Sequence, residues 1–399
     1  MPRLNSLCLL LATIGAPALA QTKAPQTTNT GPDIVVTGVS LNDAKAALKA
    51  CLDQHCPPDK DIAATLAVAE TQFVAGDYKS ARGTMLSSIG RNRRFAKQYP
   101  VPVSDLLRAN SRVAAHLGEE TAYRSGAIQV VTALKAGLPP SDPRVLSAQL
   151  EQGDSYAKTG DILEAVDLYQ EVASHARALK QPRNEGFALL RIARLYAALS
   201  YGKSSQYYPE ALAAANRLIA RREPDLAPFA QAAKLLKANI AIRHGDAGAV
   251  DHLIEEYRAS GAGANVPVAL YAPKIELRQL SGREGASGTT LNQLALDEFD
   301  NQWVDVSFLV NADGKVSDAE VLRKSNKLSG DWVKPILTAV AARRYAPLAP
   351  DSPGFFRVER YSFTSAWTTV TGSRLRVRSP IPKIEMVDLS RDATTSPAG

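Results

Sequence analysis

Glycines recur along the first two thirds of the chain with a regular spacing. They stand at positions 76, 118, 160, 202 and 245, so that successive glycines are 42, 42, 42 and 43 residues apart. A fixed period of this length is the signature of a repeat array, in which each unit buries its apolar face on its neighbours. Between the glycines the sequence is rich in alanine, and its apolar residues follow the spacing of amphipathic helices. We therefore expect residues 41–262 to form a series of stacked helical hairpins.

Each recurring glycine suits the turn of a hairpin, because a residue without a Cβ adopts the left-handed conformation that ends a helix. Three of these glycines are followed by an aspartate that can cap the next helix, as in Gly160-Asp161. The best-matching unit contains Gly153, Tyr156, Gly160, Asp161, Ala165 and Tyr169. This pattern resembles the tetratricopeptide repeat, although the period is near 42 residues instead of about 34. The resemblance implies an all-α solenoid.

The first helices of such hairpins line one concave face of the array. When the repeats are placed in register, that face carries Arg108, Arg112, His116, Arg191, Arg194, Asn239 and Arg243. A partly basic groove would bind an acidic peptide or a C-terminal carboxylate through bidentate arginine contacts. Glu70, Glu151 and Asp154 interrupt the basic residues. The alternative is therefore a solvated face of mixed charge with local ion pairs.

The N-terminus has the pattern of an export signal. Arg3 precedes an apolar stretch, and the small-residue site Ala18-Leu19-Ala20 follows it. The apolar stretch is shorter than the roughly 20 residues that span a bilayer, which favours cleavage after Ala20 over a retained anchor. We expect residues 1–20 to be a signal peptide and the mature protein to lie in the periplasm. Residues 21–40 are predicted to be a flexible leader that contains one short strand-like run, Asp33-Ile-Val-Val-Thr-Gly38.

Two cysteines remain after removal of the signal, namely Cys51 and Cys56. Exported proteins meet oxidising conditions, so we predict a disulfide between them. The Pro57-Pro58 pair would end the helix there and allow the two Cα atoms to approach. Free thiols are one alternative, and a metal site of Cys51, His55 and Cys56 is another.

The C-terminal part of the sequence has the periodicity of strands. Glycine-rich stretches within residues 263–299 indicate a linker, and from Trp303 apolar residues alternate with a period of two. The expected elements are a hairpin turning at Asn311-Ala-Asp-Gly314, a helix over 331–344, and strands over 355–367 and 368–377. This order of two strands, a helix and two strands predicts a small β-β-α-β-β domain over residues 300–378, with helices on one face of its sheet, and hence an α+β chain of several domains. The proline-containing residues 379–399 are predicted to be a disordered tail.

Three ordered motifs in this domain resemble the C-terminal domain of TonB-family energy transducers. They are Gln302–Leu322, Ala342-Arg-Arg-Tyr-Ala-Pro347 and Arg357-Val-Glu-Arg-Tyr-Ser-Phe363. In that family an unpaired edge strand, matched here by 358–366, receives a short box from outer-membrane receptors. The resemblance implies partner binding along this strand, through Val358, Arg360, Ser362 and Thr364. The Asp33–Gly38 run is similar to such a box; the alternative is a minor strand on the protein's own surface.

Composition gives little support to catalysis. The chain of 399 residues has a net charge of +7, five histidines and three cysteines, without a spaced set of metal ligands or a nucleophile motif. We therefore expect no cofactor, no metal, no nucleic acid and no small-molecule substrate. The preferred interpretation is a non-enzymatic, periplasmic scaffold that binds proteins or peptides of the cell envelope. One alternative is a TonB-like energy-transducer component that keeps its N-terminal segment as a membrane anchor, and a further alternative is an enzyme.

Overall fold

The computed structural model describes residues 39–200, 206–246, 248–259, 267–275, 302–326, 328, 330–349, 352–369 and 376–390. These residues belong to one compact unit. The predicted signal peptide, the Asp33–Gly38 run and most of the predicted linker lie outside the described residues.

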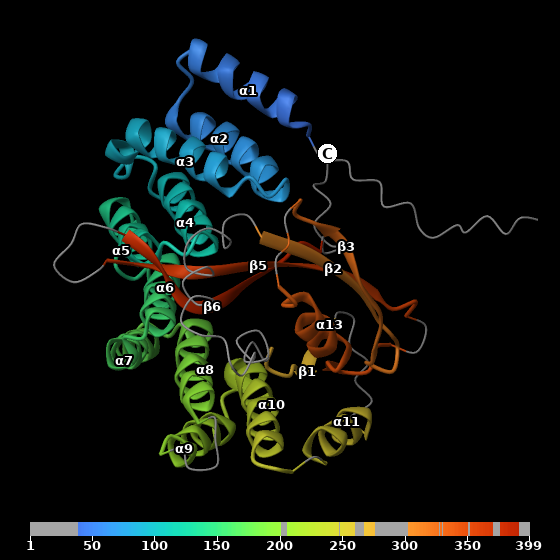
Figure 1. Ribbon diagram of the computed structural model, residues 1–399. Coiled ribbons are helices and arrows are strands. Elements are labelled where there is room, and N and C mark those ends of the chain that lie inside the picture. The colour runs from blue at the N-terminus through green and yellow to red at the C-terminus, as the bar shows by residue number, and fades with distance from the viewer. Residues whose placement is uncertain are drawn as a thin grey trace, which may run out of the picture. The chain divides into compact units, whose positions relative to one another are not determined.

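The helical part consists of α1 (Leu41–Asp53) followed by five hairpins (Figure 1). The hairpins are α2 (Pro58–Val74) with α3 (Tyr78–Asn92), α4 (Pro100–His116) with α5 (Glu120–Gly137), α6 (Pro143–Thr159) with α7 (Ile162–Ala178), α8 (Pro182–Leu199) with α9 (Tyr208–Ile219), and α10 (Ala227–Arg243) with α11 (Ala249–Ala259). Successive helices contact one another from α1 to α11. The expected array of helical repeats is therefore present in the structure.

Four of the five recurring glycines form turns within hairpins, and the fifth, Gly202, lies outside the described residues. Gly76, Gly118, Gly160 and Gly245 have φ angles of 83°, 72°, 95° and 104°, which lie in the left-handed region that favours glycine. After the first of these turns, Asp77 accepts a hydrogen bond from the Ser80 amide at 3.1 Å and caps α3. The 42-residue period thus reflects the local geometry of one turn per hairpin.

The C-terminal part is built on two small sheets. Strand β1 (Ala269–Tyr271) pairs with β4 (Arg344–Tyr345). The larger sheet is antiparallel with the order β3–β2–β5–β6, in which β2 is Gln302–Val310, β3 is Val316–Lys324, β5 is Phe355–Thr369 and β6 is Arg376–Asp388. Helix α13 (Val333–Ala341) follows β3. The region is therefore α+β, as the period of two indicated.

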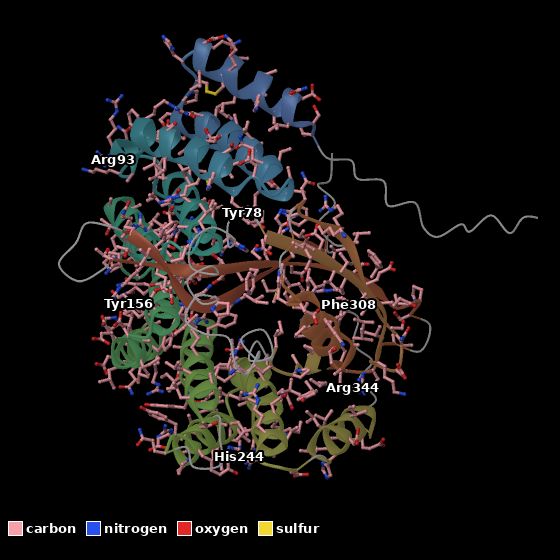
Figure 2. The ribbon with its side chains drawn as sticks, in the orientation of Figure 1. Tyr78, Arg93, Tyr156, His244, Phe308 and Arg344 are labelled. Carbon is pink, nitrogen blue, oxygen red and sulfur yellow. A yellow bond between two sulfur atoms is a disulfide. The ribbon has the colours of Figure 1, made fainter. Side chains whose placement is uncertain are left out.

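Both faces of the larger sheet are covered. On one face, Val306, Phe308 and Tyr361 belong to an apolar cluster with Ile336 of α13 (Figure 2). On the opposite face, Arg360 reaches the backbone carbonyls at the end of α2. The prediction that helices cover one face only is wrong, because the turns of the helical array cover the other.

The C-terminal boundary of the sheet also differs from the prediction. Residues 376–388 form β6, which pairs with β5 from Glu359↔Asp388 to Thr369↔Arg376. The predicted disordered tail is therefore wrong for its described part, residues 379–390. Pro382 faces Ser365 in this ladder. An edge strand tolerates proline where the missing N–H would point away from the sheet, and so this proline did not end the strand.

Candidate functional site

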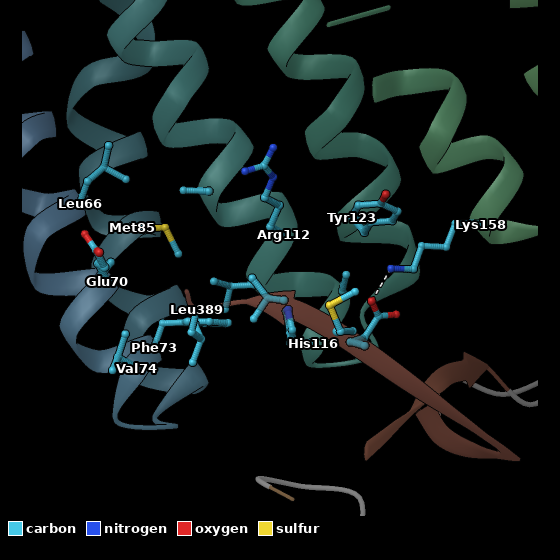
Figure 3. Close-up of a pocket in the computed structure, with 17 residues that line it drawn as sticks. Leu66, Glu70, Phe73, Val74, Met85, Arg112, His116, Tyr123, Lys158 and Leu389 are labelled. Atoms are coloured by element: carbon cyan, nitrogen blue, oxygen red, sulfur yellow. Dashed lines mark hydrogen bonds and ion pairs between the residues drawn. The ribbon is translucent and has the colours of Figure 1, made fainter. Parts of the chain in front are cut away.

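One hollow next to the concave face is a cavity of about 640 Å³ (Figure 3). Helices α2, α4 and α6 contribute side chains to its wall, and β6 contributes residues 385–387, with Leu389 just beyond its end. Its floor is apolar and includes Leu66, Phe73 and Val113. The sequence predicted that the first helices of the hairpins line one face. It gave no indication that β6 forms the opposite wall of the cavity.

The rim of this cavity carries charged side chains along its length. Glu70 of α2 is exposed at one end, and Lys158 of α6 pairs with Glu385 of β6 at the other (Figure 3). Arg112 of α4 lies between them with a side chain that is 70% exposed. Burial, together with the nearby charges of Asp154 and Glu385, raises the pKa of Tyr123 to about 12. The Tyr123 hydroxyl is therefore a neutral hydrogen-bonding group at neutral pH.

A second hollow of about 540 Å³ lies further along the concave face, between α6 and α8. Its lining includes Phe187, Arg191 and Arg194, and it shares Lys158 with the first cavity. Cavities of this size hold several side chains of a ligand. The two hollows together form what we name the groove, lined by α2, α4, α6, α8 and the end of β6.

Several of the predicted groove arginines are already paired. The Arg108 guanidinium donates to Glu151 at 2.7 Å, and that of Arg191 donates to both carboxylate oxygens of Asp154 at 2.8 and 3.0 Å. Arg112 is held more loosely, 3.8 Å from Glu151. These contacts match the local ion pairs of the alternative interpretation, and they leave much less uncompensated positive charge than a basic groove would have.

The remaining predicted groove residues differ in their surroundings. Arg194 is exposed in the second hollow, and no ion pair of it is seen among the described residues. The Asn239 side chain donates to the Leu270 carbonyl at 2.6 Å, so this residue holds β1 against α10. Arg243 lines neither hollow. The usable polar contacts of the groove are thus concentrated at Arg112 and Arg194.

The predicted binding strand is not an edge of the sheet. Strand β5 pairs with β2 on one side and with β6 on the other, which leaves no unpaired row of backbone groups along Val358–Ala366. Arg360, Ser362 and Thr364 are at most 1% exposed. The prediction that Val358, Arg360, Ser362 and Thr364 bind a partner is wrong. Strand β6 already pairs along the expected free edge of β5, and the helical array already covers the face that carries these side chains.

Arg360 instead joins the sheet to the first hairpin. Its guanidinium donates to the carbonyls of Phe73 and Val74 at 2.6 and 2.7 Å, which are among the last carbonyls of α2. It also pairs with the fully buried Asp305 at 2.6 Å and stacks on Trp303, 3.9 Å from the ring centre. This arrangement compensates a buried charge with several hydrogen bonds.

A buried hydrogen-bonded chain lies beside this arginine. The Ser362 hydroxyl is 2.7 Å from the Tyr78 hydroxyl and 2.9 Å from Nδ1 of His116 (Figure 2 labels Tyr78). Burial, with the positive charges of Lys158 and Arg360, lowers the pKa of His116 to about 3. His116 is therefore neutral at physiological pH, and it acts here as a polar link between array and sheet.

Arg378 of β6 repeats the same contact at the second hairpin. Its guanidinium donates to the Leu117 carbonyl at 2.8 Å, and the Trp367 amide donates to the Gly118 carbonyl at 3.0 Å. The contacts of Arg360 and Arg378 with the array had no signal in the sequence. Their partner carbonyls, at Phe73 and Leu117, are more than 200 residues away, so no local pattern could have indicated them.

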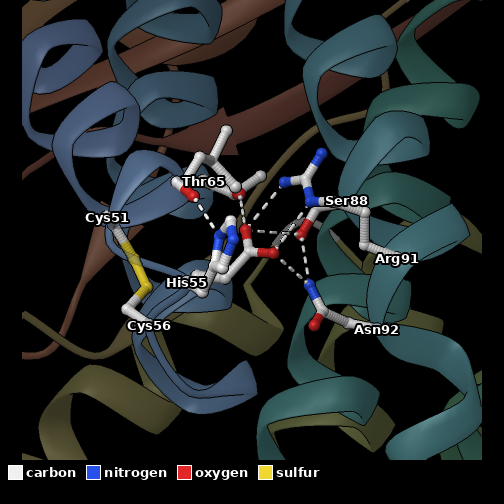
Figure 4. Close-up of a disulfide and its surroundings, with 9 residues drawn as sticks. Cys51, His55, Cys56, Thr65, Ser88, Arg91 and Asn92 are labelled. Carbon is white, nitrogen blue, oxygen red and sulfur yellow. Dashed lines mark hydrogen bonds and ion pairs between the residues drawn. A yellow bond between two sulfur atoms is a disulfide. The ribbon is translucent and has the colours of Figure 1, made fainter.

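The two cysteines lie at the first connection of the chain. Cys51 and Cys56 form a disulfide with their Cα atoms 5.2 Å apart (Figure 4). Below it, the buried Asp61 accepts hydrogen bonds from Arg91 and Asn92. Burial alone would raise the pKa of Asp61, but these hydrogen bonds outweigh it and lower the pKa. The disulfide and this cluster hold α1, α2 and α3 together.

Among the described residues, His, Cys, Asp and Glu side chains form no group that could hold a metal ion. No helix of the described chain combines the length and the apolar character needed to cross a bilayer.

Comparisons with known proteins find similarity at the level of solved structures. No family model matches the sequence, and no curated protein matches it. BtubC from P. vanneervenii superposes with a TM-score of 0.43 and 13% identity, over 59% of this chain and 97% of its own. A crystal structure of nearly identical TPR-like repeats from Podosopora anserina superposes with a TM-score of 0.39 and 18% identity, over 51% of this chain and 94% of its own. The chain is thus similar, over about half of its length, to solved structures that include TPR-like repeats.

Proposed function

We propose that this protein is an exported, non-enzymatic scaffold that binds a protein segment in its groove. The observation that carries the proposal is the first cavity, where an apolar floor lies beneath the exposed Arg112 and between two walls of different origin. Such a hollow, with an apolar floor and a few polar groups on its rim, suits the side chains of a ligand segment. Arg112 and Arg194 supply the charged contacts, and proteins or peptides of the cell envelope are the proposed partners.

The proposed location follows from the N-terminal sequence. A chain processed after Ala20 would enter the periplasm, where the disulfide between Cys51 and Cys56 is stable. N-terminal sequencing of the protein from the envelope fraction tests this step. A chain that begins at Gln21 supports export with cleavage, whereas a chain that keeps its first residues favours the anchored, transducer-like alternative.

The proposed relation to the TonB-family domain rests on the order of elements. Strands β2 and β3, helix α13 and strand β5 follow one another as the motifs of that family imply. Here β6 occupies the side of β5 to which the family's partner would add. We therefore place the partner-binding role in the groove and not on β5.

Photo-crosslinking tests the groove directly. A photoreactive residue would replace Ala109 of the first hollow or Leu190 of the second in the full chain, so that Arg112 and Arg194 stay in place, and Leu163 of α7, 76% exposed, would be the control position. We expect crosslinks to envelope proteins from the two groove positions that disappear when excess unlabelled protein competes. Equal crosslinking from position 163, or none from the groove, would contradict the proposal.

A further inference from the structure

The outer edge of β6 forms part of the cavity wall and has no strand beside it among the described residues. The Leu389 amide donates to the Val358 carbonyl at 2.8 Å, and the register from Glu359↔Asp388 to Ser365↔Pro382 is regular. In an antiparallel ladder, residues alternate between bonding to the partner strand and pointing away from it. The backbone groups of Ile384, Met386 and Asp388 therefore point outward.

The sequence of β6 marks where this outward edge is usable. Pro380 and Pro382 precede it and lack the N–H that an added strand would need. From Ile384 onward the strand contains no proline as far as Asp388, and Met386 is 52% exposed. The usable edge is thus short and lies along the residues that border the cavity.

The charged residues on the rim favour one order of charges along a strand that adds to this edge. Along the cavity, β6 runs from Glu385, paired with Lys158 of α6, to its end at Asp388, and the next residue, Leu389, lies beside Phe73 of α2 (Figure 3). A strand added antiparallel to β6 would run the opposite way, from α2 towards α6. Its first residues would meet the exposed carboxylate of Glu70, and its later residues would meet the guanidinium of Arg112. Antiparallel pairs are the commoner kind in sheets.

We propose that the groove binds an extended partner segment as an added antiparallel strand on β6. The segment carries a basic residue before an apolar one and an acidic residue after it, all three on the face towards the array. The apolar side chain enters the 640 Å³ cavity, while main-chain hydrogen bonds to Ile384, Met386 and Asp388 hold the backbone. This inference rests on the proposed function of the groove and specifies the chemistry of its partner.

A pair of peptides with the same composition tests the direction. The first is Ser-Lys-Thr-Leu-Thr-Glu-Ser, in which lysine, leucine and glutamate share one face of a strand. The second exchanges its lysine and glutamate. Binding to the full chain is measured by fluorescence anisotropy with capped, labelled peptides. We expect the first peptide to bind roughly fivefold to tenfold more tightly, because exposed ion pairs are each worth up to about 1 kcal/mol.

Two changes to the backbone test strand addition itself. Methylation of the peptide amides, one at a time, should weaken binding at every second residue, because only alternate amides point to β6. In the protein, Met386→Pro removes an outward N–H and should weaken binding at least tenfold, whereas Met386→Thr keeps that N–H and should bind within about threefold of the original chain. Far-UV circular dichroism checks the fold of both variants, and the methylated peptides need no variant at all.

The outcomes separate this inference from the proposed function. Alternating sensitivity to methylation with a preference for the first peptide supports strand addition. Equal sensitivity along the peptide overturns it, even if groove crosslinks persist, and so does the absence of saturable binding by either peptide. The proposed function fails only if the groove crosslinks themselves are absent.

Discussion

Two pairs of hairpin turns show how one sequence pattern acquires different roles. Gly76, Gly118, Gly160 and Gly245 all have positive φ and all end the first helix of a hairpin. A Cβ at Gly76 would overlap the indole of Trp303, and one at Gly118 would overlap the Ser365 carbonyl. At Gly160 and Gly245 a Cβ would meet nothing within 4 Å. The first two turns therefore serve a local and a long-range purpose, whereas the other two serve the local one only.

The largest effect is expected from removing the arginine that joins the sheet to the first turn. Arg360→Leu removes the hydrogen bonds to the Phe73 and Val74 carbonyls, of which Phe73 keeps the Gly76 amide as a donor, and it leaves Asp305 with Arg323 as its remaining ionic partner. Breaking a buried pair in this way costs about 3–5 kcal/mol of unfolding free energy. Denaturation by urea measures the loss.

The matched control for that variant is Arg191→Leu, which breaks the partly exposed pair with Asp154 near the turn at Gly160. We expect a cost below about 1 kcal/mol there. Equal losses for the two variants would mean that the sheet contributes no special stability to the first turn.

The glycines themselves give the next largest difference. Gly118→Ala and Gly160→Ala both place a Cβ in the left-handed region, which costs about 1–2 kcal/mol. Only at Gly118 does the Cβ also collide with the backbone of β5. We expect an additional loss of about 1–3 kcal/mol at that position alone, as for other overpacked sites. If both variants lose the same free energy of unfolding, β5 does not pack closely enough against the turn at Gly118 to exclude a Cβ.

Loss of the disulfide should have a smaller and local effect. Closing so short a loop between Cys51 and Cys56 contributes about 2 kcal/mol or less by the chain-entropy estimate. The double variant Cys51→Ser, Cys56→Ser should therefore show faster amide exchange in α1, with unchanged exchange in β5. Thiol labelling of the unreduced, denatured protein should find no free cysteine. Faster exchange throughout the sheet would show that α1 and the sheet are coupled.

The titration of His116 gives the smallest expected change in the free energy of unfolding, counted per pH unit. The pKa of His116 is lowered to about 3, so between that value and its ordinary 6.5 the unfolded chain binds a proton that the folded chain does not. Stability contributed by neutral His116 is therefore present above pH 6.5 and is lost as the pH falls, by up to about 1.4 kcal/mol per unit. Urea denaturation of the original chain and of His116→Asn between pH 7 and 5 should diverge by this slope. Parallel curves would place His116 outside the buried chain.

How much could be predicted from the sequence depends on how local the cause is. The hairpins follow from glycine turns, and the pair Cys51–Cys56 lies within one short connection. The strands β2 and β3 follow from alternation and from the turn at Gly314. In contrast, residues 379–388 of β6 were predicted as part of a tail, because their prolines appear unfavourable until β5 is known to lie on their other side.

The groove shows the same division. The sequence placed Arg112 and Arg194 on the concave face, but the loss of free charge at Arg108 and Arg191 depends on acidic residues of neighbouring helices. The second wall of the cavity belongs to β6, which lies far along the chain.

By itself the sequence determined the repeat, the turns and the alternation of the strands, because φ preferences and hydrophobic period act over a few residues. The tertiary structure alone decided that the polar face of β2 and β5 is buried. Asp305, Arg360 and Ser362 read as solvent-facing residues in a period of two, yet all three are buried. Arg360 and Ser362 find hydrogen-bond partners in α2, α3 and α4, more than 240 residues away, and Asp305 pairs with Arg323 and Arg360. A polar side chain can be buried when its partners are present, and the position of those partners is a property of the folded chain.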